Sequence, residues 1–184
     1  MDMIKAPRWV VLQITERCNL RCRMCYEWGE CGAYLEKKPS EFHDLPLDKI
    51  EEVIADLKAY KPHFELFGGE PMMHPQFREI IKMINRHNCL IDIPTNGTLL
   101  HRYAEELARS CVNVIWVSID GPEQYNDLQR GSGVYQLAYE GIKKLKYYKE
   151  LYQNDRPNIG VTLVITPNNT GLSKNSFVKY LIAA

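Results

Sequence analysis

The sequence carries no excess charge of either sign, because 23 lysine and arginine residues balance 23 aspartate and glutamate residues. This balance points to neither nucleic acid nor a membrane surface as a partner. The longest apolar run, Trp9 to Ile14, is far too short to span a bilayer, and no apolar signal segment precedes it. We therefore expect a cytoplasmic protein with no nucleic acid and no membrane among its partners.

The cysteines of this chain do not favour a disulfide framework. The chain has six cysteines, and thiols in the cytosol stay reduced. Three of them, Cys18, Cys22 and Cys25, fall within one short stretch, and such clustering indicates a metal site. The sequence also lacks repeats and low-complexity segments. Its hydrophobic content of 45% is ordinary for one globular core.

Short apolar runs alternate with helical patterns along the chain. Strands are predicted at residues 9–14, 64–67, 90–93, 114–117 and 159–165. Apolar residues spaced as on one helix face predict helices around 50–57, 77–84 and 100–107, and further helices are expected over 134–148 and 173–184. Five consecutive βα units imply an α/β fold with a parallel sheet, either open or curled into a partial barrel.

Polar and glycine-rich clusters follow the first four predicted strands. In such folds the active site lies beyond the carboxyl ends of the strands, so these clusters should meet. They are Cys18 to Cys25 with Met24, then Gly68-Gly69-Glu70, then Thr95-Asn96-Gly97, then Ser118 and Asp120.

The glycine pair and the acid after it suit the binding of a cofactor. Gly68 and Gly69 allow a ligand to approach the backbone closely, so their peptide groups could bond an ammonium. Glu70 could bond the same ammonium or support the loop. Thr95-Asn96 is interpreted either as a ligand site or as a turn.

Three later residues suit other parts of a cofactor. Ser118 and Asp120 offer acceptors for ribose hydroxyls or an ammonium, although Asp120 is also compatible with a simple turn. Arg130 could pair with a carboxylate through its planar guanidinium, or it could cap a helix.

Thiolates select iron–sulfur clusters, zinc or Cu(I). Four cysteines would close a 4Fe–4S cluster, whereas three leave one iron open for a small chelating molecule. A structural zinc loop is the alternative, and Cys31 or His43 could then supply the fourth ligand.

The combination of these motifs resembles the radical S-adenosylmethionine (radical SAM) superfamily. The C-x3-C-x2-C spacing of Cys18, Cys22 and Cys25 matches its hallmark, and Gly68-Gly69-Glu70 matches its GGE motif. Ser118 and Asp120 look like its ribose-contacting positions. The stretch from Ser118 to Gly131 is similar to the peptide-modifying branch that often carries a SPASM domain.

The resemblance implies a fold, cofactors and a reaction. The fold is a partial (βα)6 barrel, and the cofactors are a 4Fe–4S cluster and S-adenosylmethionine. One electron, supplied by a donor such as flavodoxin or ferredoxin, cleaves the cofactor, and the resulting 5′-deoxyadenosyl radical abstracts hydrogen from a substrate. The substrate is expected to be a peptide or, as the second choice, a small molecule.

Two features depart from the family pattern. The residue before the third cysteine is often aromatic and lies near the adenine, but here it is Met24, whose backbone contacts alone could persist. About five βα units are present instead of six, and no cysteine follows Cys111 to bind SPASM clusters. Residues 1–184 are therefore expected to be a C-terminally truncated radical SAM core. A core that binds the cofactors without catalysis is the alternative to an active enzyme.

Overall fold

The computed structural model describes residues 7–170 of the chain. Five parallel strands form one sheet in the order β1-β2-β3-β4-β5, so each strand pairs with its neighbour in sequence. The strands are β1 (Trp9–Thr15), β2 (His63–Gly68), β3 (Leu90–Thr95), β4 (Val114–Ser118) and β5 (Asn158–Thr162). The predicted α/β fold with five parallel strands is confirmed.

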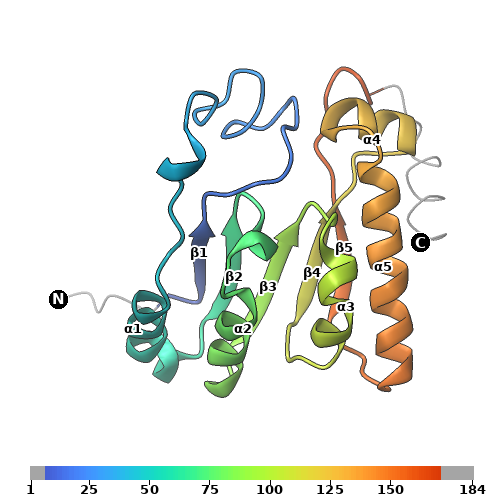
Figure 1. Ribbon diagram of the computed structural model, residues 1–184. Coiled ribbons are helices and arrows are strands. Elements are labelled where there is room, and N and C mark those ends of the chain that lie inside the picture. Colours follow the sequence, from blue (N-terminus) through green and yellow to red (C-terminus); the bar gives the residue numbers. More distant parts are fainter. Residues whose placement is uncertain (1–6, 171–184) are drawn as a thin grey trace.

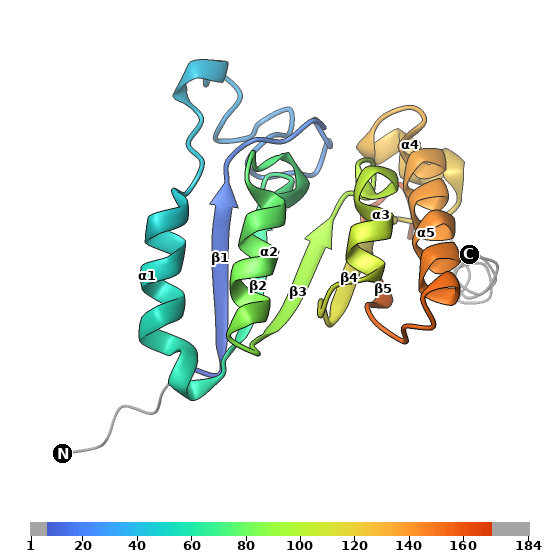
Figure 2. The same ribbon diagram turned by 60° about the horizontal axis from the view of Figure 1, so that its bottom comes forward.

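Helices cover one face of this sheet, as in part of a barrel (Figure 1, Figure 2). The helices that cover this face are α1 (Leu47–Leu57), α2 (Phe77–Arg86), α3 (Leu100–Ala108) and α5 (Val134–Leu151), whereas α4 (Glu123–Arg130) lies beyond the carboxyl ends of the strands (Figure 1). Short 3-10 turns are η1 (Pro39–Glu41), η2 (Lys58–Tyr60) and η3 (Pro71–Met73). None of the described helices is long and apolar enough to cross a membrane.

The alternation of side chains along each strand builds the core on the helical face. Alternate strand residues such as Ile14, Leu66 and Ile93 are fully or almost fully buried against residues of α1 to α3 and α5. The intervening residues, such as Trp9 and Trp116, face the other side of the sheet and stay partly exposed. This period of two is the one that a strand with a single helix-covered face requires.

The structure corrects two details of the predicted elements. The fifth strand ends at Thr162, three residues before the predicted end at Ile165. Just beyond it, the backbone N–H of Val164 donates to Asp120 Oδ1 at 2.8 Å instead of continuing the sheet. Helix α4 was not predicted, because its buried side chains are Asn126, Gln129 and Arg130 rather than an apolar stripe. The predicted helix over 173–184 lies outside the described residues.

Candidate active site above the sheet

The loops beyond the carboxyl ends of the strands enclose a cavity of about 320 Å³. All three clustered cysteines line it. So do seven of the nine predicted cofactor residues, namely Met24, Gly68, Gly69, Thr95, Asn96, Ser118 and Arg130. Glu70 and Asp120 are the two that do not line the cavity, and both are fully buried behind its wall. The structure therefore brings together residues that are more than 100 positions apart in the chain.

The cysteine loop leaves the end of β1 and rises above the sheet (Figure 1). A tight turn closes it, in which the N–H of Cys25 donates to the carbonyl of Cys22 at 2.9 Å. The N–H of Arg23 donates to the carbonyl of Gln129 at 2.8 Å, which ties the loop to the end of α4. The C-x3-C-x2-C spacing thus becomes a turn held from both sides, with its sulfur atoms facing one cavity.

Cys22 is buried, whereas Cys18 and Cys25 are partly buried and have weak donors nearby. Backbone N–H groups point at Cys18 Sγ from Leu20 (3.5 Å) and at Cys25 Sγ from Trp28 (3.3 Å). Burial raises the pKa of the Cys18 thiol to about 12 and also raises that of Cys22. Binding of a metal or cluster by these thiols would therefore have to displace their protons, as metal binding to cysteine does in general.

The donor set fits a 4Fe–4S cluster. Three soft thiols that line one cavity could ligate three irons and would leave the fourth iron without a protein ligand. Across residues 7–170, no three cysteine, histidine, aspartate or glutamate side chains are arranged to enclose a single metal ion.

The glycine pair holds the end of β2 against the cysteine loop. A Cβ atom on Gly68 would lie 2.4 Å from the carbonyl oxygen of Thr15, and one on Gly69 would lie 2.4 Å from that of Arg17. At these distances no larger residue fits without movement of the backbone. The N–H groups of Gly69 and Glu70 donate to the same two carbonyls, at 2.9 and 2.7 Å. The glycines therefore position the loop as well as lining the cavity.

Glu70 clamps the turn that follows β3. Its carboxylate accepts from Thr95 Oγ1 at 2.8 Å, from the N–H of Asn96 at 2.8 Å and from the N–H of Met72 at 3.2 Å. Burial raises the pKa of Glu70 to about 7, and these donors oppose that increase. In this structure Glu70 supports the loop, which is the second of the two roles considered from the sequence.

Asp120 and Arg130 form a buried ion pair. Arg130 Nε lies 2.7 Å from Asp120 Oδ2, and Nη2 donates to Oδ1 at 3.0 Å. The backbone N–H of Asp120 donates to the buried Asn126 at 3.0 Å. Arg130 therefore already has a carboxylate partner within the chain while it lines the cavity, and Asp120 organises the loops around β4 and β5.

Several residues of the site escaped the sequence analysis. Asn19 accepts a hydrogen bond from Asn96 Nδ2 at 3.0 Å and donates to Thr98 Oγ1 at 2.8 Å, which ties the cysteine loop to the turn after β3. The position of Asn19 directly after Cys18 was the sequence feature that could have identified it as a site residue. The buried Asn169 donates to the carbonyl of Asp120 at 3.0 Å. No sequence signal marked Asn126 or Asn169, because buried amides follow no sequence period.

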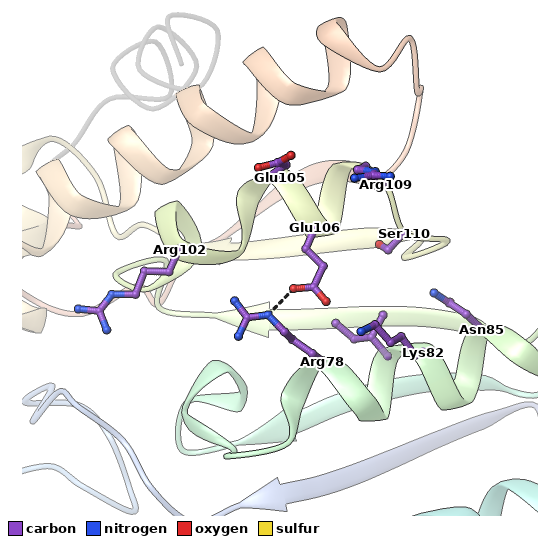
Figure 3. Close-up of a pocket in the computed structure, with 9 residues that line it drawn as sticks. Arg78, Lys82, Asn85, Arg102, Glu105, Glu106, Arg109 and Ser110 are labelled. Carbon is purple, nitrogen blue, oxygen red and sulfur yellow. Dashed lines mark hydrogen bonds and ion pairs between the residues drawn. The ribbon is translucent and has the colours of Figure 1, made fainter.

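A second cavity, of about 430 Å³, lies between α2 and α3 (Figure 3). It contains none of the predicted site residues. Arg78 pairs with Glu106 at 2.5 Å, and Glu105 accepts from the hydroxyl of Tyr152 at 2.6 Å. Arg109 lies at the carboxyl end of α3, where a cation offsets the helix dipole. Ion pairing, hydrogen bonding and the helix dipole account for these four charges, and the predicted site residues lie in the other cavity, so the candidate active site is the cysteine-lined cavity.

Comparison with known proteins gives the family. The model of the Radical SAM superfamily matches residues 12–165. A "tungsten-containing aldehyde ferredoxin oxidoreductase cofactor-modifying protein" of Pyrococcus furiosus is 32% identical over 88% of this chain and 45% of its own length. A GTP 3′,8-cyclase of Alkaliphilus oremlandii is 32% identical over 72% of this chain and 41% of its own. The chain thus spans less than half the length of these curated relatives.

Solved structures share the fold. Native anSMEcpe with bound AdoMet and a Cp18Cys peptide superposes with a TM-score of 0.75 at 20% identity, over 96% of this chain and 48% of that one. Streptococcus suis SuiB bound to its precursor peptide SuiA gives a TM-score of 0.72 at 18% identity, over 96% of this chain and 36% of the other. The chain belongs to the radical SAM superfamily, whose cofactors are a 4Fe–4S cluster and S-adenosylmethionine.

Proposed function

We propose that Cys18, Cys22 and Cys25 hold a 4Fe–4S cluster and that the protein is an enzyme that cleaves S-adenosylmethionine reductively to start hydrogen abstraction from a substrate. The observation that carries the proposal is the shared cavity, because all three thiols face it together with the glycine pair and the polar ends of β3 and β4. The cluster and S-adenosylmethionine supply the radical chemistry when bound, and the chain supplies position and surroundings.

The residues of the chain divide into two groups under this proposal. Those that line the cavity would contact S-adenosylmethionine, with backbone groups offered by Met24, Gly68 and Gly69 and side chains by Thr95, Asn96, Ser118 and Arg130. Glu70 and Asp120 act from behind the wall. Glu70 fixes the β3 turn, and Asp120 fixes Arg130. Loss of either acid should therefore misplace its partner rather than remove a direct ligand contact.

A peptide is the proposed substrate, with a small molecule as the second candidate. The stretch from Ser118 to Gly131 is similar to the peptide-modifying branch, and two proteins of this fold have been solved with peptides bound. The GTP 3′,8-cyclase relative supports the small-molecule candidate. A one-electron donor of the flavodoxin or ferredoxin type is the proposed protein partner.

Anaerobic reconstitution with iron and sulfide tests the function. A brown protein with about four irons per chain, which releases 5′-deoxyadenosine from S-adenosylmethionine and dithionite, is expected. A colourless protein with one bound zinc would contradict the cluster. Binding of S-adenosylmethionine without any cleavage would instead favour a core that binds its cofactors without catalysis.

A further inference from the structure

Two exposed arginines flank the buried ligand Cys22. Cys22 is 9% exposed and lines the cavity, whereas Arg21 and Arg23 on either side of it are exposed at the outer surface of the loop. Neighbouring Cα atoms are about 3.8 Å apart, so each of these exposed arginines lies one residue along the chain from a proposed cluster ligand. We call Arg21 and Arg23 the basic rim.

The charge of Arg21 is held in place. Its Nη1 donates to the carbonyls of Cys18 at 3.0 Å and Leu20 at 2.8 Å, and its guanidinium lies 3.9 Å from the centre of the Trp28 ring. Within residues 7–170, no carboxylate forms an ion pair with Arg21. A cation that is already ordered loses little conformational freedom when a partner binds.

The positive charge of Arg23 is only weakly neutralised by a carboxylate. Its Nε lies 3.6 Å from Glu30 Oε1, and the two side chains are 56% and 72% exposed. Exposed pairs of this kind contribute little and are screened by salt. By contrast, the nearby Arg17 is paired with Asp44 at 3.0 Å in a half-buried site. The basic rim therefore offers positive charge that is at most weakly neutralised to solvent directly beside Cys22.

We infer that the basic rim is the docking surface for an acidic, flavodoxin-type electron carrier. The inference rests on the proposed function, since it requires a redox centre held by the three cysteines. In each encounter the reduced flavin loses one electron and the centre gains one. The rim offers the carrier a short covalent route to Cys22, and its charge attracts a carrier whose flavin is surrounded by carboxylates.

Opposite charge changes at the rim test the inference by binding. Affinity for a flavodoxin would be measured on the cluster-loaded protein at low ionic strength. Arg23→Glu should weaken binding roughly tenfold, whereas Glu30→Lys should strengthen it several-fold. Arg102→Glu is the matched control, since Arg102 is an exposed arginine on α3 beside the second cavity, and it should change nothing. Salt of about 0.5 M should remove the differences.

Release of 5′-deoxyadenosine with two reductants separates the two proposals. With flavodoxin and its reductase, Arg23→Glu should slow release and Glu30→Lys should speed it. With dithionite, both variants should match the unaltered protein. Unchanged flavodoxin affinity in both variants would overturn the docking surface. Absence of cleavage with dithionite would instead count against the proposed function, and the binding measurement would still decide the docking surface.

Discussion

At the scale of single residues, the clustered cysteines Cys18, Cys22 and Cys25 differ in location from the other three cysteines of the chain. Cys22 faces the cavity, whereas Cys111 is exposed just before β4, at the opposite end of the sheet. Cys22→Ala should remove one cluster ligand, so iron per chain after reconstitution should fall well below about four. Because the change is small, the apo protein should keep its circular dichroism spectrum. Cys111→Ala should retain full iron, and equal iron loss in both variants would contradict the assignment.

Glu70 makes the stability of the apo protein depend on pH. Its pKa is about 7 in the folded state, against an ordinary value of 4.5. Between these pH values the folded state keeps a proton that the unfolded state has lost, so the free energy of unfolding should fall as pH rises from 4.5 to 7. The decrease attributable to this shift is about 3 kcal/mol.

The control for this pH dependence is Glu70→Gln, which cannot ionise. Urea unfolding of both proteins at several pH values would measure the difference between them. The difference in free energy of unfolding between the two proteins should shift steadily in favour of Glu70→Gln as pH rises from 4.5 to 7. A constant gap between pH 4.5 and 7 would show that the burial of Glu70 does not perturb its ionisation in this way.

At the scale of elements, the close contact between β2 and the cysteine loop depends on Gly69. A methyl group there would meet the Arg17 carbonyl at 2.4 Å, so the loop must move. Gly69→Ala should lower the free energy of unfolding by about 1–3 kcal/mol and reduce iron retention. Ser132→Ala, at an exposed position, should change stability by less than about 0.5 kcal/mol. If Gly69→Ala left the free energy of unfolding unchanged, the cysteine loop would be able to move and accommodate the methyl group.

The long excursion between β1 and α1 is closed by Asp44. Its Oδ1 accepts from Thr15 Oγ1 at 2.6 Å, and its Oδ2 accepts from Arg17 Nε at 3.0 Å. Asp44→Ala should therefore speed amide hydrogen exchange across residues 16–46 while leaving β3 and β4 protected. Asp56→Ala, on the exposed side of α1, is the control. Uniformly faster exchange throughout the sheet would mean that Asp44 stabilises the whole fold instead.

At the scale of the whole molecule, the protein has zero formal net charge, and within residues 7–170 no helix covers the second face of the sheet (Figure 1). Trp9, Val11, Phe67 and Trp116 are 36–54% exposed on the face away from the helices. The isoelectric point is about 6.9, so little repulsion opposes contact between these faces near pH 7. Light scattering at fixed concentration should therefore be highest near pH 7 and should fall by pH 9. Scattering that does not vary with pH would argue against apolar self-association limited by charge.

Much of the fold followed from local patterns. The five strands and four of the five described α-helices were predicted, since a period of two or 3.6 residues reports which face of an element is buried. The exception, α4, buries Asn126, Gln129 and Arg130. Polar burial depends on hydrogen bonds with distant residues, so no local periodicity marks it. The early end of β5 has the same origin, because Val164 donates to Asp120 rather than to a neighbouring strand.

The sequence by itself determined the proposed ligand set and its location. The cysteine spacing and the order of the βα units place Cys18, Cys22 and Cys25 beside the ends of β2 to β4, because parallel strands end at one edge of the sheet. Only the tertiary structure decided which polar side chains line the cavity and which lie behind it. Glu70 and Asp120 turn away because their buried carboxylates find donors in the turn after β3 and in Arg130. Those donors come from other segments of the chain, and a buried charge must be satisfied wherever its partners lie.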